Sequence, residues 1–418
     1  MAAPSTIYHT VDHLFRQESG KMTAVLTKLL GFQNLETAQD IVQDTLLQAM
    51  NTWGYRNIPG NPEAWLYRVA KNKAIDFLRR QKKFRDIAPH YAYLLQSEYT
   101  LAPTINNLFL ENEIQDSQLR MMYACCHPAI PEESQIALTL KTLCGLSVSE
   151  IAKAYLSNDE NIAKKIYRAK EKIKTEKIEL DVPQGKELSK RTDAVLKVLY
   201  LLFNEGYNSS HPDLLIRDDL CIEAMRLCYL LSEQMVSRSS RVLALLALMC
   251  FQSSRLNTRV DDKGNIILLK YQDRRKWDQE LIQRGFHYID TATVGEKISP
   301  YHLEAGIASL HAAAPTFEQT DWNSIYRLYG ILYKHQPSPI IELNKAIASA
   351  YAVSRENALQ ELMQIKGLEN YYLYHASAGE IYFELDNKAA ARNCFQKAVE
   401  LTSSLVEKQL LLEKISLC

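Results

Sequence analysis

Hydrophobic positions recur with a helical period along almost the whole chain, and the sequence therefore predicts an all-α protein. The clearest stretch is residues 36–50, where Ala38, Ile41 and Val42 begin one apolar helix face at the i, i+3, i+4 spacing. The one departure is Asp261–Leu269, where turn-forming residues precede an aliphatic run and favour a short hairpin.

The opposite face of the 36–50 helix is polar except for a single leucine. Lone exposed leucines are common, so a solvated face with one stray apolar residue is the simplest interpretation, and a binding face is the alternative. The residues of this face are Asp40, Gln43, Asp44, Leu47 and Gln48.

A second helix is predicted from Asn61 onward, because Asn61 is a good N-cap and Pro62 suits the first helical position. Its outer side is strongly basic, and from Arg68 to Arg85 the only acidic residue is Asp76. This concentration of charge suits phosphate, although a basic solvated helix would show the same pattern. The residues that could meet nucleic acid are Arg68, Lys71, Asn72, Arg79 and Arg80, with Trp53 and Tyr55 close by.

Residues 132–174 predict a short helix, a tight turn and a longer basic helix. Gly145 ends the preceding helix, and Ser147–Glu150 has the S-x-x-E pattern of a capping box that opens the short one. Ser157 or Asn158 caps the longer helix. This is the order of a helix-turn-helix, whose second helix lies in the major groove; a helical hairpin that binds no DNA has the same pattern.

The outward side of the longer helix carries the candidate DNA contacts. Residues near the start of such a helix lie closest to base edges, and later ones reach phosphates. Candidate base contacts are Asn158, Glu160, Asn161, Lys164 and Lys165, and candidate phosphate contacts are Arg168 and Lys172.

Composition places these helices in a large, neutral chain. Its 418 residues imply more than one domain. Lys+Arg and Asp+Glu are both 49, so the basic stretches are local features. We divide the chain into a first helical block (5–83), a polar linker (84–115), a second helical block (116–180) and a long helical remainder (188–418).

No apolar run approaches the roughly 18 residues that cross a membrane, and the N-terminus lacks the pattern of a secretory signal. The eight cysteines are scattered through apolar helical stretches, as reduced core residues would be. We therefore expect a cytoplasmic protein with no membrane contact. The longest apolar run, Val242–Phe251, predicts a buried helix.

Patterns of catalytic chemistry are weak. Cys125-Cys126-His127 lacks the second ligand pair that a zinc site requires. Glu205 beside Gly206 is better interpreted as a buried polar contact than as a catalytic group. We expect no enzyme activity, no metal and no cofactor. Asp273, Arg274, Arg275 and Asp278 are hypothesised to form an ion-pair cluster.

Together, the two helical blocks resemble extracytoplasmic-function (ECF) sigma factors. The matching segments are Thr37–Ala49, Ala64–Arg80 and Leu146–Lys172, in the order and spacing of that family. The resemblance implies that the polar face of the 36–50 helix docks on the clamp helices of core RNA polymerase, which would account for Leu47. It also implies that the Trp65–Arg80 helix binds and helps open the −10 promoter element, with the Tyr55–Asn61 loop near a flipped-out base.

By the same resemblance, the helix after Asn158 reads the −35 element. Residues 203–207, 272–278 and 338–346 resemble the long C-terminal extension of one ECF subgroup, which ends in tetratricopeptide-like (TPR-like) helices. The TPR spacing is matched by Gly379, Tyr382, Ala391, Phe395 and Ala398.

The extension implies a protein or peptide partner, and we expect it to regulate activity in place of a separate anti-sigma protein. Two alternatives stay open. One is a TPR-type adaptor with incidental basic stretches, and the other is a DNA-binding regulator that does not replace a sigma subunit.

Overall fold

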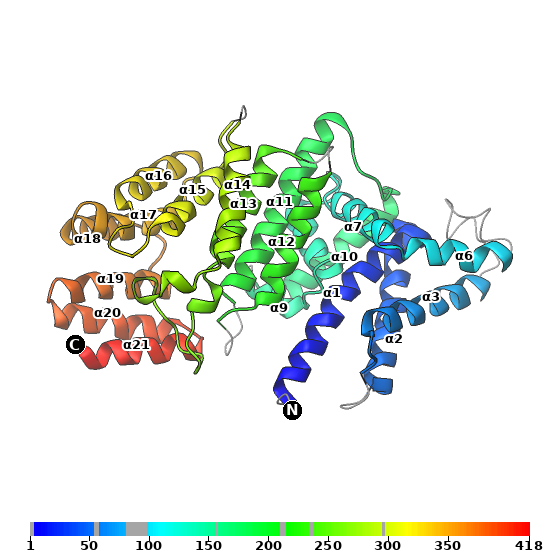
Figure 1. Ribbon diagram of the computed structural model, residues 1–418, viewed down its shortest axis with the longest axis horizontal. Helices are drawn as coiled ribbons and strands as arrows, with labels where there is room; N and C mark the ends of the chain where they lie inside the picture. The colour runs from blue at the N-terminus through cyan, green and yellow to red at the C-terminus, as the bar shows by residue number, and fades with distance from the viewer. Residues whose placement is uncertain are drawn as a thin grey trace. The chain divides into compact units, whose positions relative to one another are not determined.

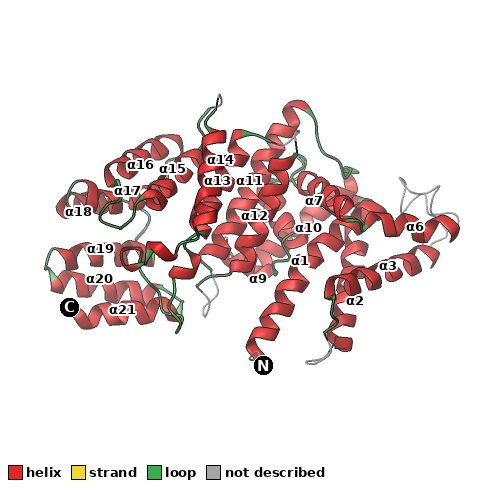
Figure 2. Cartoon of the chain, viewed as in Figure 1, coloured by secondary structure: helices red, strands yellow, loops and turns green. Residues whose placement is uncertain are grey.

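The computed structural model describes residues 4–53, 58–80, 98–154, 157–209, 215–234, 238–294 and 297–418. These ranges are helical and contain no strand (Figures 1 and 2). The hairpin expected at 261–269 is reduced to one antiparallel bridge between Val260 and Ile266. The predicted all-α fold is confirmed, and its contacts divide the chain into two compact units, residues 1–202 and 203–418.

The first unit begins with three helices around one apolar core. Met22, Leu26, Val42, Leu66 and Leu78 are among its buried residues. The short η1 (Phe32–Asn34) precedes the second helix. The helices are α1 (Pro4–Leu30), α2 (Leu35–Trp53) and α3 (Pro62–Arg80).

The segment predicted as a linker contributes to this same core. Its described part forms α6 (Glu98–Leu108) and the start of α7 (Glu111–Cys125). Ile105, Phe109 and Ile114 are buried with α1 and α3. Residues 98–115 are therefore largely helical and help to hold the first block together.

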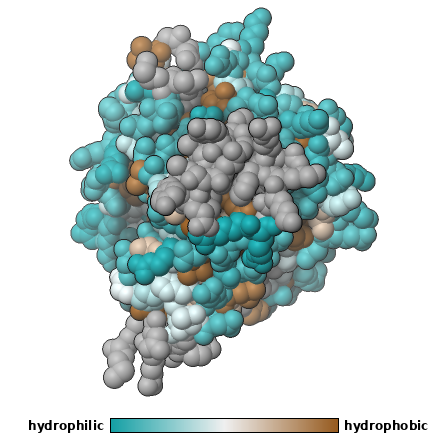
Figure 3. All heavy atoms as spheres, turned by 90° about the vertical axis from the view of Figure 1, so that its right-hand side faces the viewer, coloured by the Kyte–Doolittle hydropathy of each residue, from teal (hydrophilic) through white to brown (hydrophobic). Residues whose placement is uncertain are grey.

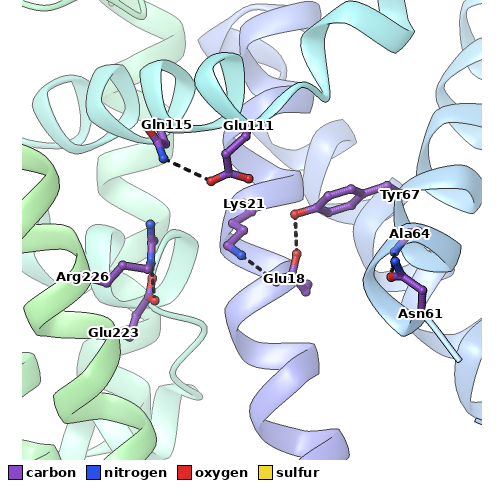
Figure 4. A network of polar contacts seen from close by, with 9 residues as sticks. All are labelled: Glu18, Lys21, Asn61, Ala64, Tyr67, Glu111, Gln115, Glu223 and Arg226. Atoms are coloured by element: carbon purple, nitrogen blue, oxygen red, sulfur yellow. Dashed lines mark hydrogen bonds and ion pairs between the residues drawn. The ribbon is translucent and has the colours of Figure 1, made fainter.

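A buried carboxylate ties α1 to α3. Glu18 is fully buried, and its side chain accepts hydrogen bonds from the Tyr67 hydroxyl at 2.5 Å and from Lys21 Nζ at 2.8 Å (Figure 4). Burial, reinforced by the charge of Glu18, raises the pKa of Tyr67, so the phenol stays protonated and donates. This contact fixes the rotation of α3 about its axis.

The second block has the predicted helix-turn-helix. Its helices are α8 (Glu132–Thr142), α9 (Val148–Ala154) and α10 (Asp159–Thr175). The capping box is confirmed, since the backbone N–H of Ser147 donates to Glu150 Oε2 at 2.6 Å and that of Glu150 to Ser147 Oγ at 3.1 Å. Gly145 has a φ of 66°, and the Asn158 side chain caps α10 by accepting from the Asn161 N–H at 2.9 Å.

Helix α11 (Gly185–Tyr207) begins in the first unit. The Thr192 hydroxyl lies 3.1 Å from the Tyr123 hydroxyl of α7, and Arg191 Nη1 donates to the Tyr123 carbonyl at 3.4 Å. The division by contacts therefore falls within α11, beyond the boundary at 188 drawn from sequence.

The second unit is built around a helix, α13, whose central ten residues are all apolar. All ten residues of Val242–Phe251 in α13 are buried, as the sequence predicts. Helices α12, α14 and α15 pack on it. Their bounds are α12 (Asp218–Glu233), α13 (Ser240–Ser253), α14 (Gln279–Ala292) and α15 (Pro300–Ala313).

The loop between α13 and α14 corrects one hypothesis. Asp273 pairs with exposed Arg275 and caps a short turn, whereas Asp278 caps α14. Arg274 is buried and donates to the carbonyls of His311 and Ala314 at 2.7 and 2.9 Å. The four residues form no common ion-pair cluster, because only Asp273 and Arg275 pair with each other, whereas Arg274 and Asp278 bond to backbone groups elsewhere. The short helices of this loop are η3 (Leu256–Thr258), η4 (Leu269–Tyr271) and η5 (Arg274–Lys276).

The chain ends in a row of helices, each packed on the next (Figure 1). The TPR-like spacing has a direct structural basis in the α19–α20 pair. A Cβ on Gly379 would lie 2.6 Å from the Phe395 ring, so only glycine permits this approach. The helices are α16 (Trp322–His335), α17 (Pro339–Ala352), α18 (Arg355–Gln364), α19 (Tyr372–Glu384), α20 (Lys388–Leu401) and α21 (Leu405–Leu417).

We expect Gly379→Ala to destabilise the second unit by about 1–3 kcal/mol, because the added methyl overlaps the Phe395 ring. Gly330→Ala is the matched control, since its Cβ would meet nothing within 4 Å and alanine favours a helix. Thermal unfolding of both variants measures the difference. A Gly379→Ala chain that melts at or above the parent temperature would contradict the packing.

Six cysteines are buried, and Cys394 and Cys418 are half-buried. Burial raises the pKa of the Cys125 thiol to about 12. Within the described ranges, no cluster of three His, Cys, Asp or Glu side chains is arranged to hold a metal ion. No described helix is both long and apolar enough to cross a membrane.

Candidate functional site

Helix α2 presents a polar face with an apolar spot. Ala38, Ile41, Val42, Thr45 and Ala49 lie on its buried side. The opposite side carries a set of exposed residues that we call the acidic face of α2. Its members are Asp40, Gln43, Asp44, Leu47 and Gln48.

Leu47 is 55% exposed within this face, and the neighbouring Met50 is 63% exposed. An apolar pair surrounded by acids and amides has the composition of an interface core with a polar rim. Met50 is absent from the predicted binding face. Its position three residues after Leu47, on the same side of the helix, could have identified it.

Helix α3 carries the basic surface. Asn61 caps it by accepting from the Ala64 N–H at 2.9 Å (Figure 4). The Lys71 ammonium is half-buried, 5.4 Å from the centre of the Phe109 ring, and burial, then Arg68, lowers its pKa. The exposed members of the predicted set are Arg68, Asn72, Arg79 and Arg80. From the side on which α3 and α6 lie, the described surface is largely hydrophilic (Figure 3).

Trp53 is a correction to the predicted DNA-binding set. Its side chain is only 3% exposed and packs against Phe15 and Trp65, with ring centroids 5.5 and 5.3 Å away. In this conformation it belongs to the core and presents no face on which a base could stack. Tyr55 lies outside the described residues.

Helix α10 buries Ile162, Ile166, Ala169 and Ile173 and turns its basic side outward. Lys165 is half-buried and pairs with Glu133 at 2.6 Å. The Lys164–Glu160 pair is more exposed, at 2.6 Å. Ion pairs of this kind contribute about 0–1 kcal/mol, so DNA phosphates could displace them. The exposed members of the predicted set are Asn158, Glu160, Asn161, Lys164, Arg168 and Lys172.

The first and second helical blocks meet at a polar contact between α2 and α10. Glu36, at the start of α2, lies 2.8 Å from Lys174 Nζ and 3.8 Å from Lys170 Nζ. The hydrogen bond from Lys174 is the main cause that lowers the pKa of Glu36. The same contact raises the pKa of Lys174.

A second contact joins α1 to the turn that follows α8. A Cβ on Gly20 would lie 2.0 Å from the Leu143 carbonyl oxygen, so the two backbones touch. Nearby, Arg16 Nη1 pairs with Glu150 Oε1 at 3.2 Å. We call these two contacts, at Glu36 and at Gly20, the closed junction. No local sequence pattern predicts this junction, because its partners are more than a hundred residues apart.

Residues 14–84, which span α2 and α3, match the family model described as sigma-70 region 2. The ECF RNA polymerase sigma factor SigE of Mycolicibacterium smegmatis is 26% identical over 164 residues, which are 39% of this chain and 60% of SigE. The ECF RNA polymerase sigma-E factor of Escherichia coli is 29% identical over 139 residues, covering 32% of this chain and 70% of its own.

The chain belongs to the ECF sigma factor family. Sigma factors are not enzymes, in agreement with the expected absence of catalysis. The second unit sets this sigma factor apart from its short relatives. Residues 191–293 match a family of unknown function, DUF6596. An uncharacterised protein of Rhizobium meliloti is 34% identical over 392 residues, which are 93% of this chain and 92% of that protein.

The Rhizobium similarity therefore includes the C-terminal extension, which fits the subgroup with a long extension. No solved structure matches this sigma factor.

Proposed function

We propose that this sigma factor binds core RNA polymerase through the acidic face of α2 and directs it to specific promoters. The observation that carries the proposal is Leu47, an apolar residue exposed on a face whose four other predicted members are polar and also exposed. The face lies within residues 14–84, the part similar to sigma-70 region 2. An exposed apolar residue ringed by polar ones is typical of a docking surface.

Helix α3 is proposed to bind the −10 element and α10 the −35 element. The exposed cations Arg68, Arg79 and Arg80 supply phosphate contacts on α3, and Asn72 supplies a group that can hydrogen-bond a base. On α10, Asn161 and Lys164 lie near the capped start of the helix, the part of a recognition helix that reads base edges.

Binding both elements requires the closed junction to open. About 25 base pairs separate positions named −35 and −10, roughly 85 Å of B-DNA at 3.4 Å per pair. Helix α2 has 19 residues, a length of about 28 Å, and it touches α10 through Glu36 while packing on α3. Helices this close cannot reach sites that far apart, so we infer that the closed form precedes promoter binding.

Run-off transcription with purified core polymerase tests the proposal. We expect defined transcripts from a fragment upstream of this gene only when the protein is added. A DNA-binding regulator that acts without polymerase would instead bind duplex DNA alone, with an affinity that falls steeply as salt rises. A TPR-type adaptor would associate with no polymerase, and absence of both transcript and core binding would overturn the proposal.

The second unit is proposed to regulate the first. We expect a chain ended after Leu202 to differ from the full chain in promoter output by about fivefold or more, because allosteric coupling typically reaches 1–3 kcal/mol. Ending the chain after Leu202 keeps the contacts of Thr192 and Arg191 with Tyr123. A cut after Pro183 would remove both contacts. Equal output from both chains would contradict regulation by the extension.

A further inference from the structure

A cavity of about 190 Å³ lies within the second unit, between the α13–α14 loop and helices α16, α17 and α19. Leu268, Leu269 and Lys270 of the loop form one of its walls. Apolar cavities of about 150 Å³ already hold a benzene ring. This cavity is partly open to solvent and is large enough for a single ring or a branched aliphatic group.

The wall opposite the loop is aromatic. The Trp322 and Tyr351 rings stack with centroids 4.6 Å apart, and Phe317 meets them at 5.0 and 5.1 Å. The Trp322 indole N–H already donates to the Phe317 carbonyl at 3.3 Å, so it offers no free donor. With Ile347 and Ile381 beside it, this wall favours an apolar, ring-sized group.

The charged side chains that line the cavity are Lys270, Glu380 and Glu384, and both carboxylates also have a cation partner outside the lining. Glu380 pairs with Lys414 at 2.7 Å and Glu384 with Arg355 at 3.0 Å. Lys270 Nζ lies 3.4 Å from an oxygen of each carboxylate. Three cations thus surround two carboxylates, and the cation in the cavity wall, Lys270, has the longest contacts.

Two donors in this wall are available to a ligand. The Lys270 ammonium has three N–H groups and only two long contacts. Burial opposes its charge, but Glu380, Tyr271 and Glu384 raise its pKa overall, so it stays protonated. Ser377 lines the same cavity, and its hydroxyl makes no hydrogen bond within the described ranges.

We propose that this cavity binds a small organic acid, a monocarboxylate with a single-ring or branched aliphatic body. The body lies against Trp322 and Tyr351, and the carboxylate accepts from Lys270 and Ser377. An amine would add a fourth cation beside carboxylates that already have closer partners. The proposal concerns the second unit alone and does not depend on sigma activity.

Bound acid would link the loop to α17 and α19 through Lys270. The loop lies inside the segment that matches DUF6596, whereas those helices lie outside it. Ligand binding to the folded state alone stabilises it by mass action. Such a ligand therefore stabilises the packing of the loop against α17 and α19.

Calorimetry with the full chain tests the site, using phenylacetate, its neutral amide and benzylamine as probes. We expect saturable one-to-one binding of phenylacetate, with the amide weaker by about tenfold because a neutral carbonyl forms a weaker hydrogen bond with the Lys270 ammonium than a carboxylate does. Benzylamine is expected not to bind. Benzylamine that binds as tightly as phenylacetate, or more tightly, would overturn the proposal. So would the absence of phenylacetate binding at about 10 mM, a concentration that detects even weak affinity.

Two variants locate the binding. Lys270→Gln should weaken phenylacetate about tenfold, whereas Lys263→Gln, an exposed lysine of the same loop, should leave it unchanged. Ser377→Phe places a ring in the cavity and should abolish binding while the melting temperature is maintained. Parental affinity in both Lys270→Gln and Ser377→Phe would place the acid elsewhere and contradict the assignment.

Discussion

The double variant Asp44→Arg/Leu47→Glu is expected to lose affinity for core RNA polymerase by about 100-fold or more. Truncating a single interface hot spot costs about 2 kcal/mol or more, and here an apolar anchor and a charge are both reversed. Both side chains are exposed on α2 and its buried stripe is untouched, so the fold should be unaffected. Competition for core polymerase with a labelled parent chain measures the loss.

The matched control is Asp290→Arg/Leu412→Glu, which makes the same changes at exposed positions of α14 and α21. We expect it to bind core polymerase as the parent chain does. Parental affinity in the α2 variant would refute the docking assignment. A lower melting temperature in that variant alone would show misfolding instead, and single Asp44→Asn and Leu47→Ala changes would then decide.

Gly20→Ala is expected to open the closed junction. The methyl group of alanine would lie 2.0 Å from the Leu143 carbonyl oxygen. Because that oxygen belongs to the backbone, no flexible side chain can move aside to relieve the clash. We expect a loss of about 1–3 kcal/mol or more from the first unit. Amide exchange should accelerate in α9 and α10, and binding to a −35 duplex should increase. Small-angle scattering should show a larger radius of gyration.

Gly60→Ala is the control within the same unit, because a Cβ there meets nothing within 4 Å. It should leave exchange, scattering and DNA binding unchanged. Gly20→Ala with parental scattering and exchange would mean that α1 and the α8–α9 turn are not held together in solution. Faster exchange throughout α1 to α3 would indicate general unfolding and contradict selective opening.

The local structure of the first unit was largely predictable, because its signals are local. The Ser147–Glu150 capping box and the Asn158 cap depend on residues within one helical turn of each other, and the structure confirms both. The exposed face of α2 follows from the same logic, since a stripe buried at i, i+3, i+4 leaves the opposite side to solvent. The binding roles of that face stay predictions.

What the sequence could not reveal depends on contacts between distant segments. Trp53 sits beside a basic helix in sequence, but Phe15 of α1 covers its ring. In the predicted linker, Ile105, Leu108 and Phe109 have helical spacing, but Pro103 and the polar residues around them obscure that short signal, and all three reach the core. The Glu36–Lys174 pair closes over 138 positions of sequence, and no periodicity reports such a contact.

The rate at which the buried cysteines react with an alkylating reagent reports local unfolding around each of them. A thiol must reach solvent and ionise before it can be alkylated, and burial raises the pKa of Cys125, Cys221 and Cys250 to about 12. Cys394 and Cys418, which are half-buried, should therefore react first. Timed alkylation followed by peptide mass spectrometry would then measure the opening rate of each unit separately, in a chain without mutations or labels.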